Sequence, residues 1–409
     1  MDAVFQLQTR MAAAPPPPVG GEKPDPFSKR PKDTAFKQQR LLSWQPVWSP
    51  PWVIFCFAIL ALLFLPLGGA IIAVSDSVVE VKHRYDHIQA CPPESRTEAN
   101  DWACEPLHVR FDVPRTMVAP VFIYYELSNF YQNHRRYAKS RNDLQLVGES
   151  VPLDSLGSDC DPFRHPGQYI DLSAEPNRTV KFDANDAAPP VDIASIAYSP
   201  CGLIAWSMFN DTFDIVQNAT SGTQTLLCKG DNFRPDGQVI DTTLAPHCKK
   251  DKIEWPTDRG GKYNPPSRSD RSILTSRGWP QAPNGSEYPL AVFVQKGYYV
   301  GELGHRIPDV EDLDLMVWMR LASLSTFRKL YRRIEVDVPA GQYDFVIHQR
   351  YDIRSFQGKK SVVLTTSSWV GGRNYMLGGL YIATGSVCLI LALGFLAKYF
   401  TTPRRVGRL

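Results

Sequence analysis

The side chains that most often bind metal ions in proteins, histidines and clustered carboxylates, form two groupings in this sequence. His83 and His87 are four residues apart, so on a helix their imidazoles would share one face and could hold a metal. No third ligand is indicated, and we expect a solvated segment instead. The carboxylates between Asp309 and Asp314 lack the regular spacing and the central glycine of a calcium loop. We interpret them as acids at the start of a helix, where they favour the helix dipole. The sequence predicts no metal site.

The sequence also lacks the signatures of common enzymes. It contains no His-Glu-x-x-His, no Cys-x-x-Cys and no Gly-x-Ser-x-Gly motif. The glycine-containing basic run Arg259–Lys262 has neither the spacing of a phosphate-binding loop nor its following serine or threonine. We therefore expect no catalytic residue and no cofactor, and we turn to the organisation of the chain for its class of function.

The composition excludes several classes of protein. The 409 residues include 45 basic and 42 acidic side chains, and a net charge of +3 is too small for a typical nucleic-acid binder. Apolar residues make up 43% and charged residues 21%, which argues against wholesale disorder and against a pore built of many helices.

Two stretches contain no charged residue: Trp52–Val74, with 23 residues, and Met376–Ala397, with 22. As helices they would be about 33 to 35 Å long, enough to cross the hydrocarbon core of a bilayer. The first is too long and starts too late for the apolar region of a cleaved signal, so we expect a retained anchor. Apart from Cys56, Cys388 and Tyr381, which are neutral at pH 7, they contain no ionisable side chain, which argues against transport of a polar solute by this chain alone.

The charges on either side of the two spans predict the topology. Residues 1–51 contain seven basic and four acidic side chains, and residues 398–409 contain four basic and none acidic. The segment between the spans has 34 basic and 38 acidic side chains, a net charge of −4. Because basic flanks stay in the cytosol, both termini are expected to be cytosolic and the middle segment lumenal or extracellular.

Cysteines and glycosylation sequons agree with this orientation. Four sequons lie in the middle segment, at Asn177, Asn210, Asn218 and Asn284. Six cysteines lie there too, and an oxidising compartment would pair them: Cys91, Cys104, Cys160, Cys201, Cys228 and Cys248. Six cysteines allow 15 connectivities, among which the sequence alone does not choose. We favour pairing in sequential order, since each pair then closes a short or moderate loop.

The domain boundaries follow from the spans. We expect an N-terminal cytosolic tail, a first transmembrane helix, an ectodomain, a second transmembrane helix and a C-terminal cytosolic tail, at residues 1–51, 52–74, 75–375, 376–397 and 398–409. Residues 1–33 have almost no apolar periodicity and are expected to be disordered. Residues 34–51 mix basic and large aromatic side chains, as an interfacial belt of tryptophans or a segment docked on a partner would, and the two interpretations are compatible.

Alternating and β-branched patterns predict most of the ectodomain elements. Strands are expected at His108–Val113, Val118–Leu127 and Ser361–Ser368, with a hairpin whose arms Glu335–Val338 and Tyr343–Tyr351 flank a Pro-Ala-Gly turn. Helical spacing of apolar residues predicts a helix over Asp312–Ile334. Early and late strands separated by loops favour an α+β ectodomain built on an antiparallel β-sandwich, with the two chain ends meeting above the membrane.

Two surface features could mark a binding partner. The densest basic run of the ectodomain consists of Arg135, Arg136, Lys139 and Arg141. A solvated or ion-paired helix face is favoured there, and contact with lipid headgroups or a partner is the alternative. In the spans, Gly69 with Ala73 and Gly379 with Ala383 form pairs of small residues that permit close helix packing, which weakly indicates a partner helix.

Five segments of the chain resemble the cell-division-control protein 50 family, also called the transmembrane protein 30 or ligand-effect modulator family. They are Thr34–Arg40, Tyr124–Tyr137, Pro200–Thr212, Met316–Tyr331 and Gly371–Gly378. The resemblance runs from about residue 32 to residue 400, with both spans in register.

This resemblance implies a function. Members of the family are non-catalytic β-subunits of type-IV P-type ATPases, the phospholipid flippases, and support folding, export from the endoplasmic reticulum and activity of the catalytic α-subunit. It implies residence in the endoplasmic reticulum, Golgi or endosomes and plasma membrane, next to membrane lipids. The aspartyl-phosphate motif Asp-Lys-Thr-Gly of the ATPase is absent here, so ATP hydrolysis would belong to the partner.

The resemblance also implies individual site residues. It assigns disulfides to Cys91–Cys104 and Cys160–Cys201 and a glycan to Asn210, while Cys228 and Cys248 lie in a variable region. The candidate contacts with the α-subunit come from the N-terminal segment and the ends of the spans: Phe36, Lys37, Gln38, Arg40, Trp44, Pro66, Gly68, Gly69, Gly378 and Gly379.

Two other classes of function were weighed against an accessory subunit. An independent two-span receptor or lipid-binding ectodomain would leave the endoplasmic reticulum without a partner. An ectoenzyme would need a catalytic constellation, which the sequence does not contain. The charge of −4 also raises the hypothesis that the ectodomain meets basic loops on its partner.

Overall fold

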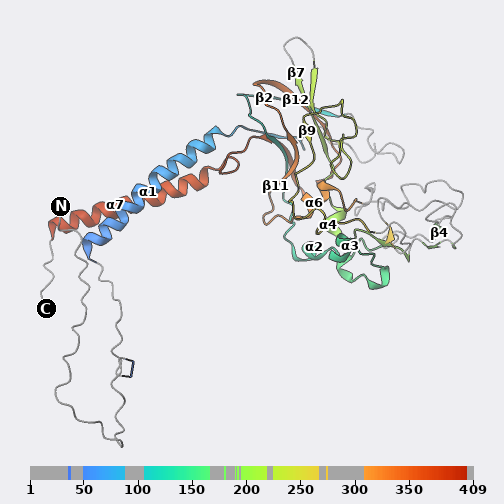
Figure 1. Ribbon diagram of the computed structural model, residues 1–409, viewed down its shortest axis with the longest axis horizontal. Coiled ribbons are helices and arrows are strands. Elements are labelled where there is room, and N and C mark those ends of the chain that lie inside the picture. The colour runs from blue at the N-terminus through green and yellow to red at the C-terminus, as the bar shows by residue number, and fades with distance from the viewer. Residues whose placement is uncertain are drawn as a thin grey trace, which may run out of the picture. The chain divides into compact units, whose positions relative to one another are not determined.

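The computed structural model describes residues 36–37, 49–87, 106–165, 179–180, 189, 191–192, 195–218, 224–266, 273–274 and 308–402. The chain forms two compact units. One contains residues 1–68 and 380–409 and holds most of the two long terminal helices, and the other contains residues 69–379 and holds the sandwich (Figure 1). Each unit is described separately below.

The two long helices are α1 (Pro50–Ser77) and α7 (Tyr375–Thr401), and both are apolar and long enough to cross a membrane. Each contains one of the spans expected from the sequence and extends a few residues beyond it. They contact each other through Leu65 of α1 and Gly385 of α7, where an added Cβ would come within 2.9 Å of the leucine Cγ. Nearer the two chain termini, Phe57 and Phe395 stack at 6.0 Å between ring centroids. A helix surface that contacts apolar side chains on one side and is exposed on the rest suits a lipid environment.

The ectodomain is built on two antiparallel sheets, which confirms the expected sandwich. The first sheet has the strand order β1–β13–β3–β11–β9: Glu80–Arg84, Lys359–Thr365, Val121–Ser128, Phe327–Ile334 and Cys248–Lys249. The second has the order β2–β12–β7–β8: Leu107–Val113, Gly341–His348, Thr212–Asn218 and Gln224–Cys228. The strands of both sheets pair antiparallel with every neighbour.

The smaller elements lie between the sandwich strands along the chain. They are the helices α2 (Arg135–Lys139), α3 (Asp143–Val147), α4 (Leu203–Trp206) and α6 (Leu313–Met319), the 3₁₀ turns Leu153–Ser155, Ser158–Cys160 and Arg354–Phe356, the antiparallel pair β4 (Thr179–Val180) and β5 (Val191–Asp192), and the parallel pair β6 (Ala197–Tyr198) and β10 (Ile273–Leu274). Figure 1 shows α2, α3, α4 and α6 grouped together beside the sheets.

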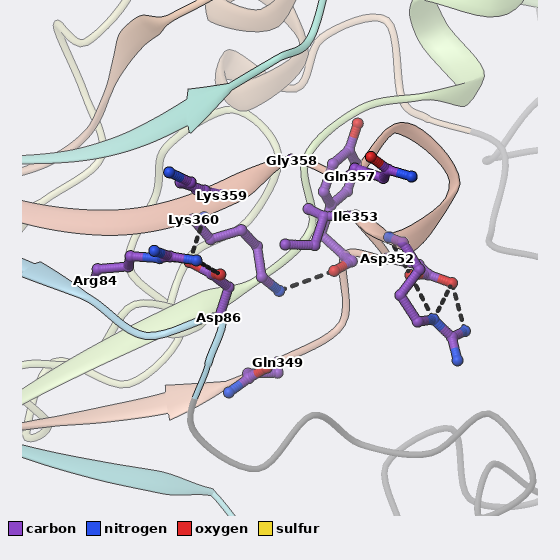
Figure 2. A pocket seen from close by; sticks show the side chains of 11 residues that line it. Arg84, Asp86, Gln349, Asp352, Ile353, Gln357, Gly358, Lys359 and Lys360 are labelled. Atoms are coloured by element: carbon purple, nitrogen blue, oxygen red, sulfur yellow. Dashed lines mark hydrogen bonds and ion pairs between the residues drawn. The ribbon is translucent and has the colours of Figure 1, made fainter.

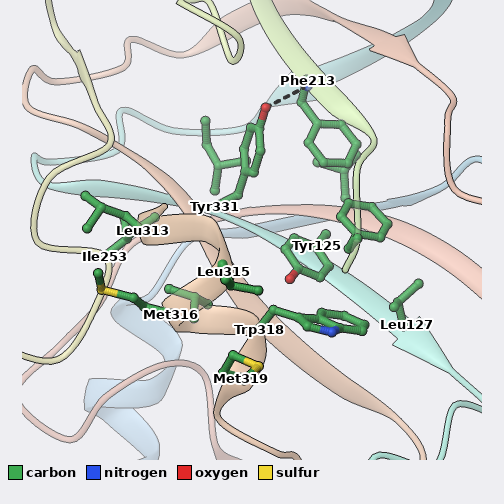
Figure 3. Packing of buried hydrophobic residues seen from close by; sticks show 14 of the residues in the cluster. Tyr125, Leu127, Phe213, Ile253, Leu313, Leu315, Met316, Trp318, Met319 and Tyr331 are labelled. Atoms are coloured by element: carbon green, nitrogen blue, oxygen red, sulfur yellow. Dashed lines mark hydrogen bonds between the residues drawn. The ribbon is translucent and has the colours of Figure 1, made fainter. Parts of the chain in front are cut away.

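Period-two patterning explains the sandwich. In β3 the buried positions alternate with half-buried ones, so that Ile123, Tyr125 and Leu127 point into the core. Tyr331 of the first sheet meets Phe213 of the second edge-to-face at 5.1 Å, and its hydroxyl accepts the Phe213 backbone N–H (Figure 3). Helix α6 closes the core, because nearly all of its side chains are buried, including Trp318.

The expected helix over Asp312–Ile334 is wrong in its second half. Only Leu313–Met319 is helical, and Phe327–Ile334 forms strand β11, between β3 and β9 in the first sheet. The apolar residues of this region fit one helical face, and those of β11 do not alternate. The strand accommodates their spacing through a register shift between Leu330 and Arg332. Pairing along β3 satisfies the backbone of β11 on one edge, and this tertiary gain outweighs a weak local preference.

The expected hairpin around Pro339-Ala-Gly341 is also wrong. The strands on either side, β11 and β12, belong to different sheets, and β12 pairs with β2 and β7. The segment between them crosses from one sheet to the other, and Val338 bridges Met117, which makes the same crossing on the way from β2 to β3. A turn signal fixes a reversal of the chain but does not say which strand becomes the partner.

Two disulfides are present among the described residues of the ectodomain, and the second joins β8 of one sheet to β9 of the other. Cys160 pairs with Cys201 and Cys228 with Cys248, with Cα–Cα distances of 5.5 and 4.9 Å. These are two of the three sequential pairs expected from the sequence, and Cys91 and Cys104 lie outside the described residues. Cys56 and Cys388, in the two long helices, are free thiols.

Candidate partner interface

The N-terminal candidates fall mostly outside the described residues. Phe36 and Lys37 lie in a turn with exposed side chains, while Gln38, Arg40 and Trp44 are not described. Helix α1 then begins at Pro50, and its Trp52 stacks on Phe55 at 5.5 Å.

The small residues of the helices differ in what surrounds them. Gly68 and Gly378 are buried, whereas Pro66, Gly69 and Gly379 are exposed. A Cβ added at Gly69 or Gly379 would meet nothing within 4 Å, unlike one added at Gly385. The close contact between α1 and α7 therefore uses Gly385, a glycine that no pattern in the sequence distinguishes from its neighbours.

The ends of the two helices are tied to the sandwich by a group that we call the juxtamembrane collar: Ser75, Asp76, Arg115 and Arg373–Tyr375. The Ser75 hydroxyl donates to the Asn374 carbonyl at 3.1 Å, and the Tyr375 hydroxyl donates to Asp76 at 2.7 Å. Arg373 donates to that tyrosine oxygen at 2.7 Å, and Arg115 donates to the Asp76 carbonyl. Hydrogen bonds between residues almost 300 positions apart hold the two chain ends of the ectodomain together.

The two histidines do not share a helix face. His83 lies in β1, with its ring 5.9 Å from Phe111, and burial lowers its pKa, while His87 lies in a turn after the strand. Among the described residues no group of three possible ligands is close enough to hold a metal ion.

The basic run of the sequence becomes an exposed surface, here called the basic platform: His134, Arg135, Arg136 and Lys139, with the exposed apolar side chains Tyr131 and Leu324. Within the part of the chain that the structure describes, none of the four basic side chains pairs with a carboxylate. Arg141, the fourth member of the original run, pairs instead with Asp143 at 2.8 Å. The expected ion-paired face is therefore confined to Arg141.

The basic platform rests on a rigid support made from two distant loops. The buried Gln132 accepts the Ala322 N–H at 2.9 Å, and the Asn133 amide donates to the Ser323 carbonyl at 2.9 Å. Beneath α2, the Ser140 hydroxyl accepts the Leu203 N–H at 2.9 Å. Because Leu324 comes from a loop about 190 residues further along the chain, the sequence could not show that it joins the basic run.

The acidic cluster does begin a helix, but it also binds two buried cations. Asp312 caps α6 by accepting the Asp314 N–H at 2.8 Å. Lys250 lies 2.7 Å from Asp312 and 2.9 Å from Asp314, and Arg332 makes two bonds to Asp314 at 2.7 and 3.1 Å. Burial alone would raise the pKa of Asp314, but Arg332 and Lys250 outweigh it and hold that pKa well below its usual range. We call these four side chains the buried ion cluster.

A third buried cation, Lys329, closes the other end of α6. The Lys329 amine donates to the carbonyls of Val317 and Trp318 at 3.1 and 3.2 Å and to that of Arg320. Burial, and secondarily the charge of Arg320, lower the pKa of Lys329 to about 7. Three carbonyls that the short helix leaves without partners are satisfied in this way.

An open polar pocket of about 450 Å³ lies where β1 ends and β13 begins. Its charges are largely paired, since Arg84 bonds Asp86 at 2.7 Å (Figure 2). Lys360 pairs with Asp211, behind the pocket lining, at 2.7 Å. No nucleophile stands beside a base among the residues that line it, which suits a structural pocket rather than an active site.

Two of the four sequons fall within the described residues. Asn210 is half-buried, and the carbonyl oxygen of its side chain is fully buried without a hydrogen-bond partner there. Asn218 ends β7, and its side-chain amide donates to Asp344 at 2.8 Å. Asn177 and Asn284 are not described.

Comparison with known proteins gives a consistent result. Residues 71–405 match the LEM3 (ligand-effect modulator 3) family, or CDC50 family. The chain is 35% identical over 392 residues to ALA-interacting subunit 3 of Arabidopsis thaliana, covering 93% of this chain and 89% of the relative. It is 33% identical over 395 residues to Cell cycle control protein 50A of Bos taurus, covering 95% and 93%. It is 28% identical over 433 residues to the phospholipid-transporting ATPase accessory subunit CDC50 of Chaetomium thermophilum, covering 95% and 92%.

Proposed function

The chain belongs to the LEM3/CDC50 family, and we propose that it is the non-catalytic accessory subunit of a phospholipid-transporting P-type ATPase. The observation that carries this proposal is the similarity over more than nine-tenths of the chain to relatives named as interacting or accessory subunits of such ATPases. The two apolar helices and the sandwich joined by the juxtamembrane collar fit a subunit that accompanies its partner both within and outside the bilayer.

We propose the topology that the charges favour, with both termini in the cytosol and residues 75–375 lumenal or extracellular. Disulfides at Cys160–Cys201 and Cys228–Cys248 support an oxidising compartment on that side. On the same reasoning Cys91 would pair with Cys104, and Asn177, Asn210, Asn218 and Asn284 are the candidate glycan sites. The complex would reside in the endoplasmic reticulum, the Golgi or endosomes and the plasma membrane.

Two regions are proposed to contact the catalytic subunit within and below the membrane. The exposed Gly69 and Gly379 leave room for a close approach of partner helices. Phe36 and Lys37, with the neighbouring Gln38, Arg40 and Trp44, would form the cytosolic docking segment. Pro66, Gly68 and Gly378 complete the candidate set, although the burial of both glycines gives them less free surface.

On the ectodomain, the basic platform is the proposed contact with the catalytic subunit. Strand β3 runs from Val121, next to the end of β13 and the collar, to Ser128, from which the platform follows. Eight residues of strand span about 26 Å. The platform thus lies at the opposite end of the sheet from the helix ends, which favours an acidic protein segment over the headgroups of the same bilayer as its ligand. This differs from the expectation that acidic ectodomain surface meets basic partner loops.

Such a subunit acts by mass action. A chain that binds only the folded catalytic subunit stabilises that fold, by an amount that grows with its concentration relative to the dissociation constant. If it binds one state of the transport cycle more tightly than another, it also shifts the populations of those states, but only by the difference in affinity. Hydrolysis of ATP stays with the partner, whose phosphorylated motif this chain lacks.

The test is purification of the tagged full-length chain in mild detergent, with mass spectrometry of the proteins that accompany it. We expect a P-type ATPase together with lipid-stimulated ATP hydrolysis in the eluate. A glycosylated chain that reaches the cell surface alone, with no ATPase recovered at any salt concentration, would contradict the proposal and support a receptor.

A further inference from the structure

A single tryptophan beside the second helix is left without a role by the accessory-subunit function. Trp369 is 79% exposed, more than any other large apolar side chain among the described residues. It lies six positions before the start of α7, in the segment that joins strand β13 to that helix.

The backbone presents this side chain at the tip of a tight turn. Ser368 and Gly371 exchange two backbone hydrogen bonds, of 2.8 and 2.9 Å, and leave Trp369 and Val370 as the two residues between them. Gly371 has a φ of +107°, a conformation that side chains rarely adopt. The turn is closed by its own hydrogen bonds, and the indole therefore projects from a defined support.

The turn lies at the end of the sandwich from which both long helices depart. The Thr366 N–H donates to the Val79 carbonyl at 3.0 Å, two residues after α1 ends, and the adjacent strand β3 begins at Val121. Three residues before that strand, Val118 is the other strongly exposed apolar side chain of this edge, at 67%. Exposed apolar residues thus extend past the sheet on the side where the chain enters the bilayer.

The polar neighbours of the turn suit a lipid headgroup region. Arg115 and Arg373 of the juxtamembrane collar are exposed, and Arg373 stacks over the Tyr375 ring at 5.0 Å. Indole rings, with one apolar body and one N–H, concentrate at membrane–water interfaces, and arginine beside them can reach phosphate oxygens.

We propose that Trp369, together with Val118 at the same end of the sandwich, inserts into the headgroup region of the bilayer that α1 and α7 cross and forms a third attachment of the ectodomain. The ligand is the phospholipid surface on the ectodomain side. The two helices alone would leave the sandwich held by two backbone links close together, and an interfacial tryptophan would fix its tilt. The inference depends on the chain spanning a membrane and not on which partner it has.

The test is tryptophan fluorescence of the full-length chain in nanodiscs made with phospholipids brominated on their acyl chains. Bromine quenches only indoles at the membrane, so the variant Trp369→Phe should lose part of the quenched emission, about one tryptophan's share of the nine in the chain. The matched control is Trp255→Phe, because Trp255 is also well exposed, at 61%, but its ring contacts the Arg320 guanidinium at the end of α6, at 4.5 Å.

The difference spectrum between the wild type and Trp369→Phe separates the outcomes. Quenched and blue-shifted emission supports the proposal. Unquenched emission with a water-like maximum, or unquenched blue-shifted emission that shows burial against protein, overturns it. Both variants are measured without and with co-purified ATPase. Because the measurement without ATPase needs no partner, a failure of the membrane attachment can be told apart from a failure of the proposed accessory-subunit function.

Discussion

At the scale of single residues, the charges inside the ectodomain say more about stability than those on its surface. The buried ion cluster joins Lys250, after β9, and Arg332 in β11 to the first turn of α6, and Arg332 also donates to the Gly230 carbonyl at 2.7 Å. By contrast Arg328, an exposed residue near the start of the same strand, bonds Glu80 and Glu126 where solvent reaches it. The same residue type therefore has two different energetic roles in one strand.

Replacing Arg332 by methionine is expected to destabilise the ectodomain by about 3 kcal/mol, because it removes a buried cation and leaves the half-buried Asp314 beside one cation instead of two. Arg328→Met in the same strand should cost about 1 kcal/mol or less, since exposed ion pairs contribute little. Thermal unfolding of the purified chains, followed by intrinsic fluorescence, measures both. Equal losses for the two variants would contradict the assignment of the cluster.

The buried ion cluster also makes stability depend on acid. Since the pKa of Asp314 is held below its unfolded value of about 3.9, its stabilisation is fully present above that pH and is lost as the pH falls through the folded-state pKa. We expect the unfolding midpoint of the wild type to drop between about pH 4 and pH 2, and the midpoint of Asp314→Asn to drop less over the same range. Parallel curves for the two proteins would show that Asp314 does not titrate as described.

At the scale of elements, the basic platform depends on how closely α2 and α4 approach. Gly202 precedes α4 with a φ of +93°, and a Cβ there would come within 2.2 Å of the Ser140 carbonyl oxygen, directly after α2. That oxygen also accepts the Ile204 N–H, so the backbone has little freedom to move away.

Gly202→Ala should therefore destabilise the fold by about 3 kcal/mol or more, from left-handed strain together with overpacking. The control is Gly260→Ala, where φ is also positive, at +71°, but nothing lies within 4 Å, and about 1–2 kcal/mol is expected from strain alone. Denaturant unfolding distinguishes the two, and a loss at Gly202 no larger than that at Gly260 would show that the loops separate easily.

The elements predicted correctly from the sequence are those whose pattern is local. Strand β2 alternates apolar and polar side chains, β3 and β13 contain runs of β-branched or aromatic residues, and the terminal helices have long apolar runs without charge, so local hydrophobic patterns sufficed for them. The apolar residues of β11 have the spacing of a helix, and its partner β3 lies 200 residues earlier in the chain, so no local pattern indicates this strand.

The candidate interface was predictable only in part, for the same reason. The basic run is visible in the sequence. Three other features depend on the folded chain: the exposure of Arg135 and Arg136, the ion pair of Arg141, and the position of Leu324 next to the run. The burial of Lys250, Lys329 and Arg332 could not be predicted either, because lysine and arginine side chains are mostly exposed in proteins.

At the scale of the whole molecule, the proposed docking of a partner on the basic platform predicts an effect of charge. The double variant Arg135→Glu/Arg136→Glu should reduce recovery of the ATPase several-fold, and the wild-type complex should weaken as salt is raised. Arg234→Glu/Lys252→Glu is the matched double reversal at two other exposed basic residues of the ectodomain. Quantitative mass spectrometry of the purified complexes compares them, and equal recovery for both doubles would remove the platform from the interface.

The pairing of the earliest strands with the latest ones has a consequence for how the protein is made. Strand β1 pairs with β13, β2 with β12, and β3 with β11 and β13, so none of the first three finds its neighbours until the ribosome has passed residue 327. At about 5–20 residues per second, β1 would wait roughly a quarter of a minute to a minute for β13. All four sequons and all six ectodomain cysteines precede residue 327, and they would enter the lumen on a chain that cannot yet close. The half-buried Asn210 would thus be open to sugar transfer during synthesis, before the sandwich encloses it.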